Sequence, residues 1–148
     1  MRASDLMTRD PTVVTPNDLI SRAAALMLER DVGLLPVVDD PSSMRLVGVL
    51  TDRDIAVRCV ARLHDPTCAV RHHMTSDHLA TVHPDASSDE VLSRMQAHRV
   101  RRVPVVGHDD HLEGIIAQAD VAMKLGPQQP VQVEQLVEHI SEPVVPVR

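Results

Sequence analysis

The chain has 148 residues, of which 43% are hydrophobic and 24% charged, and its formal net charge is −6 at pH 7. This composition predicts a folded protein of one domain, or of two small halves that share a core, and it excludes a largely disordered chain. Phe, Tyr and Trp are all absent, so no ring is available for base stacking, and the negative charge opposes a phosphate backbone; both argue against nucleic-acid binding.

No apolar run approaches the roughly 18 residues needed to cross a bilayer. The start of the sequence, MRASDLMTRDP, lacks the apolar centre of a signal peptide. We therefore expect no membrane partner and a cytoplasmic location. The two cysteines, Cys59 and Cys68, are too few for a disulfide framework. Buried or incidental thiols are expected, and a redox-formed local bridge stays open.

The first half of the chain predicts the element order β-α-β-β-α. A short extended segment at 12–15 is followed by a helix whose apolar face carries Leu19, Ile20, Ala23, Ala24 and Met27 at helical spacing. Two strands are expected at 34–38 and 45–50, joined by a polar turn. A second helix is expected to begin near Asp52.

The second half repeats this order. We expect an extended segment at 80–83, a helix with a capping box at 87–90 and strands at 103–106 and 112–116. A final helix begins near Gln118. Motifs recur in the same order at an offset of 66 to 68 residues, including VTP and VHP, LPVV and VPVV, GVLTDRD and GIIAQAD. A match in order over this length indicates internal duplication.

A unit of this size buries too little surface to be comfortably stable alone. We therefore predict an α+β fold in which two β-α-β-β-α repeats pack sheet to sheet with pseudo-two-fold symmetry. The predicted boundaries are 1–63 for the first repeat, 64–72 for a connector, 73–125 for the second repeat and 126–148 for a tail. Apolar residues at 133, 136, 137 and 140 predict a short closing helix in that tail.

The duplicated unit, which ends in G-h-h-T-x-x-D, resembles the CBS domain pair, also called a Bateman module, over about residues 3–125. The motifs that carry the resemblance are VTP at 14–16, VGLLPV at 32–37 and GVLTDRD at 48–54. The chain is little more than the pair, so it resembles stand-alone CBS proteins. The stretches DVGLLPVV, GVLTDRDIAVR and HRVRRVPVV resemble their hypoxic-response type.

The resemblance implies a regulatory protein that is not an enzyme and requires no cofactor. Its expected ligand is an adenosine nucleotide (AMP, ADP or ATP), bound in the cleft between the repeats. Its expected partners are a second copy, in a disk of four CBS units, and an unknown downstream protein. The hypoxic-response resemblance adds a role in stress or low-oxygen adaptation.

The heptad GVLTDRD predicts a ligand half-site. A strand runs into a helix here, so Thr51 is expected as the N-cap and Asp54 as its capping-box partner. A helix N-terminus suits a phosphate, and a carboxylate can accept both hydroxyls of a ribose. The resemblance implies the ribose role for Asp54 and a place near the phosphate for Thr51. Helix capping without any ligand stays open as the alternative.

The two repeats differ in the cations they offer to a phosphate. Arg101 and Arg102 in the second repeat align with Gly33 and Leu34 in the first. The resemblance implies that basic residues at this point reach across the cleft, so both arginines are expected to complete the half-site of the first repeat. A solvated basic edge is the alternative.

The heptad GIIAQAD predicts a poorer site. Ala117 supplies no hydroxyl, and of the polar groups only Asp120 remains. We therefore expect one competent site, with the base against aliphatic side chains and backbone near Val13, Val14, Val32 and Val49.

Histidines and cysteines gather around the connector with the spacing C-x4-H-x3-C-x3-H. Because this matches no closed zinc pattern, no metal site is predicted. No nucleophile elbow or glycine-rich phosphate loop is present, so no catalytic residue is predicted.

The competing hypothesis is a ligand-free homodimeric interaction module in which the motif aspartates only cap helices. A homodimer is expected under both hypotheses. The helix faces that carry Met27, Val91 and Met95 are expected to form its apolar patch.

Overall fold

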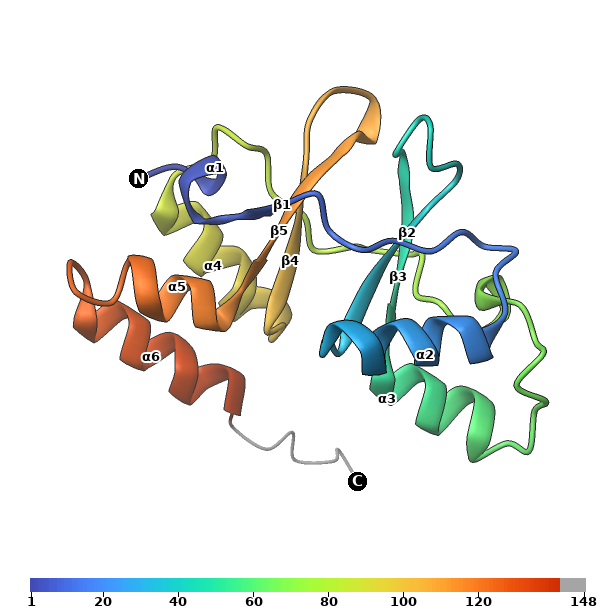
Figure 1. Ribbon diagram of the computed structural model, residues 1–148. Coiled ribbons are helices and arrows are strands. Elements are labelled where there is room, and N and C mark those ends of the chain that lie inside the picture. The colour runs from blue at the N-terminus through green and yellow to red at the C-terminus, as the bar shows by residue number, and fades with distance from the viewer. Residues whose placement is uncertain (142–148) are drawn as a thin grey trace. The chain divides into compact units, whose positions relative to one another are not determined.

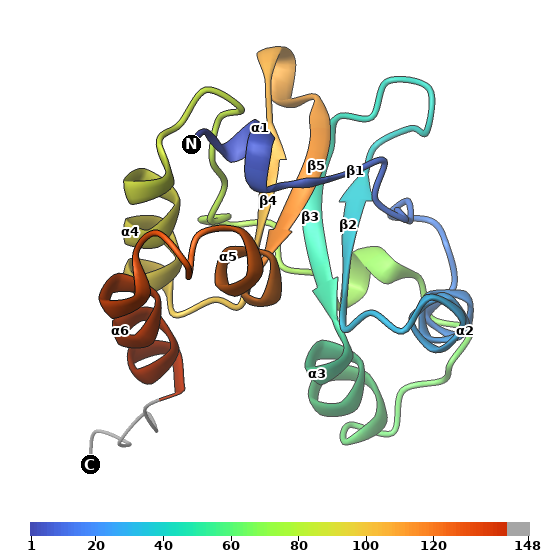
Figure 2. The ribbon, with the colours of Figure 1, turned by 60° about the vertical axis from the view of Figure 1, so that its left-hand side comes forward.

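The computed structural model describes residues 1–141 as two compact units of mixed helix and strand (Figures 1 and 2). Unit 1 comprises Met1–Arg9, Ala80–Val105 and the chain from Gly114 onward, and unit 2 comprises Asp10–Leu79 with Val106–Glu113. The predicted mixed fold class is confirmed. No helix in the described part of the chain has the length and apolar character that a bilayer crossing requires.

Unit 2 contains one hairpin and the helices that flank it. Its elements are α2 (Ile20–Arg30), β2 (Leu34–Val38), β3 (Leu46–Thr51), α3 (Asp52–Asp54), a π-helix (Ile55–Val60) and a 3₁₀ turn (Val70–His72). Strands β2 and β3 pair antiparallel, and Val14 forms a parallel bridge to Val37. The π-helix continues directly from α3, so the two form one continuous helical segment. Thr51, the last residue of β3, stands immediately before it.

Unit 1 contains a three-stranded sheet in the order β1-β5-β4. Its elements are α1 (Ala3–Leu6), β1 (Thr8–Arg9), α4 (Ser88–His98), β4 (Arg102–Val106), β5 (Leu112–Ala117), α5 (Gln118–Lys124) and α6 (Pro130–Ser141). A 3₁₀ turn (His108–Asp110) joins β4 to β5, and this tip of the hairpin belongs to unit 2. Helix α6 confirms the predicted closing helix.

The four predicted hairpin strands agree with the observed ones to within one residue at each end, and the second helices begin at Asp52 and Gln118 as predicted. The extended segments predicted at 12–15 and 80–83 form only single parallel bridges, at Val14 and Val82. The predicted face of α2 needs correction at two positions. Leu19 precedes the helix and is 43% exposed, and Ala24 is also exposed. Ser87 caps α4 by accepting the Glu90 N–H at 3.2 Å, but the described residues show no return bond from the Ser87 N–H to the Glu90 side chain, so the predicted capping box forms only in part.

The methionine faces of α2 and α4 are core, not docking surface. Met27 lies in the hydrophobic core of unit 2, and Val91 and Met95 lie in that of unit 1, where both are fully buried. The expectation that these residues form an apolar dimer patch is therefore wrong, because each face packs within its own unit.

The segment that opens each sequence repeat packs in the unit built mainly from the other repeat. Strand β1 pairs antiparallel with β5 through Thr8 and Ile115. In unit 2, Thr75 and Val49 exchange two backbone hydrogen bonds of 2.9 Å. We call the two segments, 1–9 and 70–79, the arms. Sequence repeats and compact units thus divide the chain differently.

The glycine of each heptad lets an arm pass close to a strand. A Cβ on Gly48 would lie 2.9 Å from the Thr75 carbonyl oxygen, and one on Gly114 would lie 2.7 Å from the Thr8 carbonyl oxygen. Both contacts are closer than a side chain tolerates. The glycine of GVLTDRD and that of GIIAQAD therefore have the same structural purpose.

Candidate functional site

The end of β3 places Thr51 and Asp54 in a reciprocal capping box. The Asp54 N–H donates to Thr51 Oγ1, and the Thr51 N–H donates to Asp54 Oδ2, both at 3.0 Å. The cap forms because a strand-end threonine in the extended conformation meets an acidic residue three positions later. The predicted capping geometry is confirmed, and it leaves the second carboxylate oxygen of Asp54 outside the cap.

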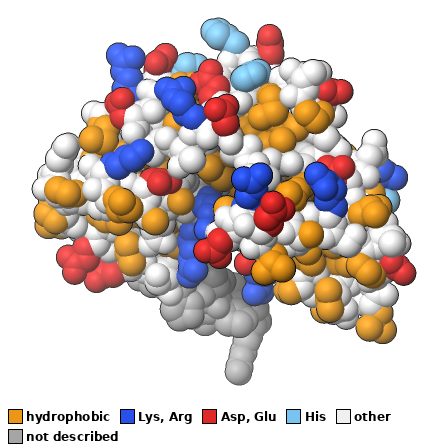
Figure 3. All heavy atoms as spheres, viewed as in Figure 1, with side chains coloured by type: hydrophobic (Ala, Val, Ile, Leu, Met, Phe, Trp, Pro, Cys, Tyr) orange, Lys and Arg blue, Asp and Glu red, His pale blue; other side chains and the backbone are white. Residues whose placement is uncertain are grey.

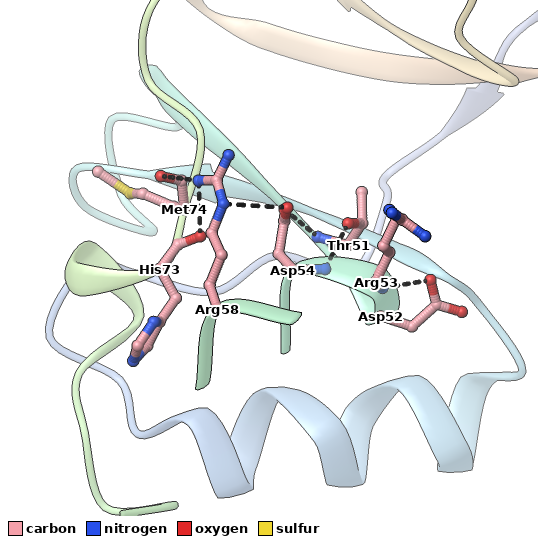
Figure 4. A network of polar contacts seen from close by, with 7 residues as sticks. All are labelled: Thr51, Asp52, Arg53, Asp54, Arg58, His73 and Met74. Atoms are coloured by element: carbon pink, nitrogen blue, oxygen red, sulfur yellow. Dashed lines mark hydrogen bonds and ion pairs between the residues drawn. The ribbon is translucent and has the colours of Figure 1, made fainter. Parts of the chain in front are cut away.

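Arg58 links this turn to the arm of unit 2 (Figure 4). Its Nε lies 3.7 Å from Asp54 Oδ1, and its Nη1 donates to the carbonyl oxygens of His73 at 3.3 Å and Met74 at 3.4 Å. Sequence reasoning missed this residue, although its place four positions after Asp54 on a helix was the available signal.

The second heptad keeps only half of this arrangement. The Ala117 N–H donates to Asp120 Oδ2 at 2.8 Å, but alanine has no hydroxyl to accept the bond that Thr51 accepts. Lys124, four positions after Asp120, donates to the carbonyl oxygens of Asp5 at 3.3 Å and Leu6 at 3.2 Å. A basic side chain therefore anchors the arm in both units.

The four valines predicted to contact the base all belong to unit 2, together with Thr51 and Asp54. Val14 is buried in the core, whereas Val13, Val32 and Val49 are half-buried. Arg101 and Arg102 belong to unit 1, where they stand at the start of β4, the first exposed and the second half-buried. Their joint action with Thr51 and Asp54 stays a prediction.

The connector brings together three metal-ligating side chains that spacing alone did not single out. One ligand atom each from His64, Cys68 and His73 lies within 4.8 Å of the others. His73 is 2% exposed, and its Nε2 has no hydrogen-bond partner among the described residues. Burial, and then the charges of His64, His72 and Arg58, lower the pKa of His73, so its imidazole is neutral at pH 7.

The two cysteines differ in environment, and both are free thiols. Cys59 is buried in the core of unit 2, where its thiol donates to the His64 carbonyl oxygen at 3.6 Å. Burial raises the pKa of the Cys59 thiol, which keeps it protonated. Cys68 is half-buried and belongs to the cluster with the two histidines.

Two copies of a strand that enters a helix through G-h-h-x-x-x-D define a tandem pair of CBS repeats. The profile of the CBS domain family matches residues 3–60 and 70–126, and the chain belongs to this family. It is 39% identical over 123 residues to Hypoxic response protein 1 of Mycobacterium tuberculosis, a match that covers 83% of this chain and 84% of that protein.

Two solved structures show the same fold. The crystal structure of Hypoxic Response Protein I with two coordinated zinc ions has a TM-score of 0.76 at 37% identity, covering 84% of this chain and 98% of that one. The structure of CBSX2 in complex with AMP has a TM-score of 0.72 at 27% identity, covering 84% and 95%. The predicted family is thus confirmed, and a CBS pair of this fold binds AMP.

Proposed function

We propose that this protein is a non-enzymatic regulatory module that binds an adenosine nucleotide at the turn formed by Thr51 and Asp54. The observation that carries the proposal is the capping box of unit 2, in a chain whose relative of the same fold is solved with AMP. A role in low-oxygen or stress adaptation, within the cytoplasm, belongs to the same proposal through the similarity to Hypoxic response protein 1.

The carboxylate of Asp54 retains the capacity to hold a ribose. An ionised carboxylate offers about four acceptor positions. One oxygen accepts the Thr51 N–H, and the other has the Arg58 guanidinium, at 3.7 Å, as its one polar contact among residues 1–141. Two ribose hydroxyls can therefore donate to this group without breaking the cap. Val13, Val32 and Val49, half-buried in the same unit, offer aliphatic surface for a base in a chain without aromatic residues, whereas the buried Val14 does not.

We propose that Arg101 and Arg102 provide the positive charge for the phosphate and that the Asp120 turn does not bind. The asymmetry in the residues supports this assignment, because Gly33 and Leu34 stand where the second repeat has arginines. Each charge-assisted hydrogen bond contributes about 1.5–3 kcal/mol. A site that lacks two or three of them loses several decades of affinity.

Thermal unfolding with AMP, ADP, ATP and S-adenosylmethionine tests the proposal, with GMP as the control ligand. Circular dichroism or a reporter dye is required, since the chain has no Tyr or Trp. A ligand at 100 times its dissociation constant adds about 2.7 kcal/mol, which raises the Tm by several degrees. No shift with any adenosine ligand up to millimolar concentration would instead support the ligand-free interaction module.

Asp54→Ala and Asp120→Ala form a matched pair of variants. Each removes the bond that the aspartate accepts from the strand end, and Asp54→Ala also removes the 3.7 Å contact with Arg58, so its loss of stability should be slightly larger. Nucleotide affinity should fall at least about 100-fold in Asp54→Ala, since two charge-assisted bonds are lost, and should stay within about twofold of the original in Asp120→Ala. Equal losses of affinity would contradict the assignment of a single site.

We further propose a homodimer that uses exposed apolar residues of unit 2. Leu28 on α2 is 86% exposed, and Val57 and Val60 on the π-helix are also exposed. Figure 3 shows hydrophobic side chains at the surface over the part of unit 2 that holds these helices. Light scattering should report a dimer that becomes a monomer in Leu28→Ser/Val60→Ser, whereas Met123→Ser in unit 1 should leave it intact.

A further inference from the structure

We propose that His64, Cys68 and His73 form a binding site for a single divalent transition-metal ion of the zinc class. The three side chains come from the connector and from the arm of unit 2, and their ligand atoms already lie within 4.8 Å of one another. All three belong to unit 2, so the site is complete within that unit.

The packing of unit 2 does not explain why a histidine, a polar side chain, is buried at position 73. Its imidazole is 2% exposed, and Nε2 has no partner within the described chain. A buried polar group without a hydrogen bond costs about 1–3 kcal/mol, and such groups are rare in folded proteins. A bound metal ion would satisfy this nitrogen and remove the cost.

The internal duplication provides a comparison at this position. Aligning Met7-Thr8 with Met74-Thr75 places Leu6 opposite His73. Leu6 is fully buried in unit 1, so the fold accepts a purely apolar side chain at this point of the arm. The histidine is therefore not a requirement of the arm's packing, and a ligand role gives a reason for its presence.

The chemistry of the three donors selects the metal. One thiolate and two imidazoles are borderline-soft ligands that suit zinc, and oxygen-preferring ions such as Mg²⁺ and Ca²⁺ are disfavoured. Zn–N and Zn–S distances of about 2.1 and 2.3 Å place tetrahedral ligand atoms about 3.5 Å apart. His64 is exposed and lines a cavity of about 560 Å³, so its ring has room for the small rotation that closes the set.

Two nearby groups lie outside the set. The Cys59 thiol is directed to the carbonyl oxygens of His64 and Asp65, at 3.6 and 3.9 Å, and so it supports the connector. Arg58 contacts the main-chain oxygen of His73, while the imidazole points away from the guanidinium (Figure 4). Three protein ligands leave a fourth position for water or for an external donor, as in open zinc sites.

Zinc titration of reduced, metal-stripped full-length protein tests the proposal. The expected result is one Zn²⁺ per chain, with a Tm increase of several degrees at 100 times the dissociation constant. Co²⁺ should bind in its place and show a thiolate-to-metal charge-transfer band. Absence of stoichiometric uptake by the unmodified protein would overturn the proposal.

Two variants locate the site, and one serves as the control. His73→Leu reproduces the residue found at Leu6, so it should fold with unchanged or higher stability and bind zinc at least about 100-fold more weakly. Cys68→Ser should bind as weakly and lose the Co²⁺ band. Cys59→Ser should retain both stoichiometry and band. Unchanged zinc uptake in His73→Leu would mean that the metal binds surface histidines. Loss of zinc uptake in Cys59→Ser would mean that the ligands are not His64, Cys68 and His73 alone. Either result overturns the assignment.

Discussion

The heptads GVLTDRD and GIIAQAD both run from a strand into a helix but differ in their side-chain bonds. In both, a glycine admits the arm, an aspartate accepts the N–H at the strand end, and a basic residue four positions later anchors the arm's carbonyl oxygens. Only the first has a hydroxyl, Thr51 Oγ1, that accepts the N–H of the aspartate.

Residues that occur in both heptads are explained by the fold, whereas residues that occur in only one are candidates for ligand binding. The shared glycine, aspartate and basic residue have structural contacts in both units, so their presence twice is no argument for two ligand sites. Thr51 strengthens the first turn, and Arg101 with Arg102 distinguishes the repeats in charge. A function specific to one heptad must rest on these unshared residues.

The largest expected effect on stability comes from the glycine that the two heptads share. Gly48→Ala and Gly114→Ala should each lower the free energy of unfolding by about 2–3 kcal/mol, because the new Cβ meets a backbone oxygen at 2.9 or 2.7 Å. Urea unfolding followed by circular dichroism measures both. Gly107→Ala is the control: its Cβ meets the end of the Glu113 side chain at 3.0 Å, which can move, so the change should stay within about 0.5 kcal/mol.

Exchanging Thr51 and Ala117 between the heptads should change the free energy of unfolding by about 1 kcal/mol, in opposite directions for the two variants. Thr51→Ala removes the acceptor of the Asp54 N–H and should destabilise by about 1 kcal/mol. Ala117→Thr supplies the missing acceptor to Asp120 and should stabilise by about 0.5–1 kcal/mol. Chemical denaturation at pH 7 gives both values. A destabilised Ala117→Thr variant would show that the second turn cannot adopt the geometry of the first.

The smallest effect concerns the two arm anchors. Arg58→Met and Lys124→Met keep much of the aliphatic length and lose the hydrogen bonds to the arm carbonyls, which are long and partly exposed. Each should lower stability by about 0.5–1 kcal/mol. Hydrogen exchange should show faster opening of the arm in the affected unit only. Equal acceleration in both units would mean that the anchors stabilise the whole chain and not their own arm.

Local patterns in the sequence predicted the elements well. The four hairpin strands were predicted to within one residue and the capping box at Thr51 and Asp54 correctly, because alternation, helical spacing and capping are local signals. The arms were not predicted, since pairing of Thr8 with Ile115 depends on residues far apart in the chain and leaves no periodicity. The π-helix at 55–60 also has no signal that we recognise.

The candidate site was predicted unevenly for the same reason. Thr51 and Asp54 lie within one heptad, so their geometry followed from sequence. Spacing does not predict the cluster of His64, Cys68 and His73, because its ligands come from a connector and an arm and match no known zinc pattern. Alignment of His73 with Leu6 was the signal that could have drawn attention to it.

The exchange of arms also determines the order in which this chain can fold. Strand β1 (Thr8–Arg9) pairs with β5 (Leu112–Ala117), so the sheet of unit 1 is completed only when these two segments, far apart in the chain, meet. Closing such a long loop delays the gain from pairing and slows folding relative to local contacts. Neither CBS repeat therefore holds all the segments of one compact unit, and we expect that a single repeat expressed alone would lack the arm that completes its unit.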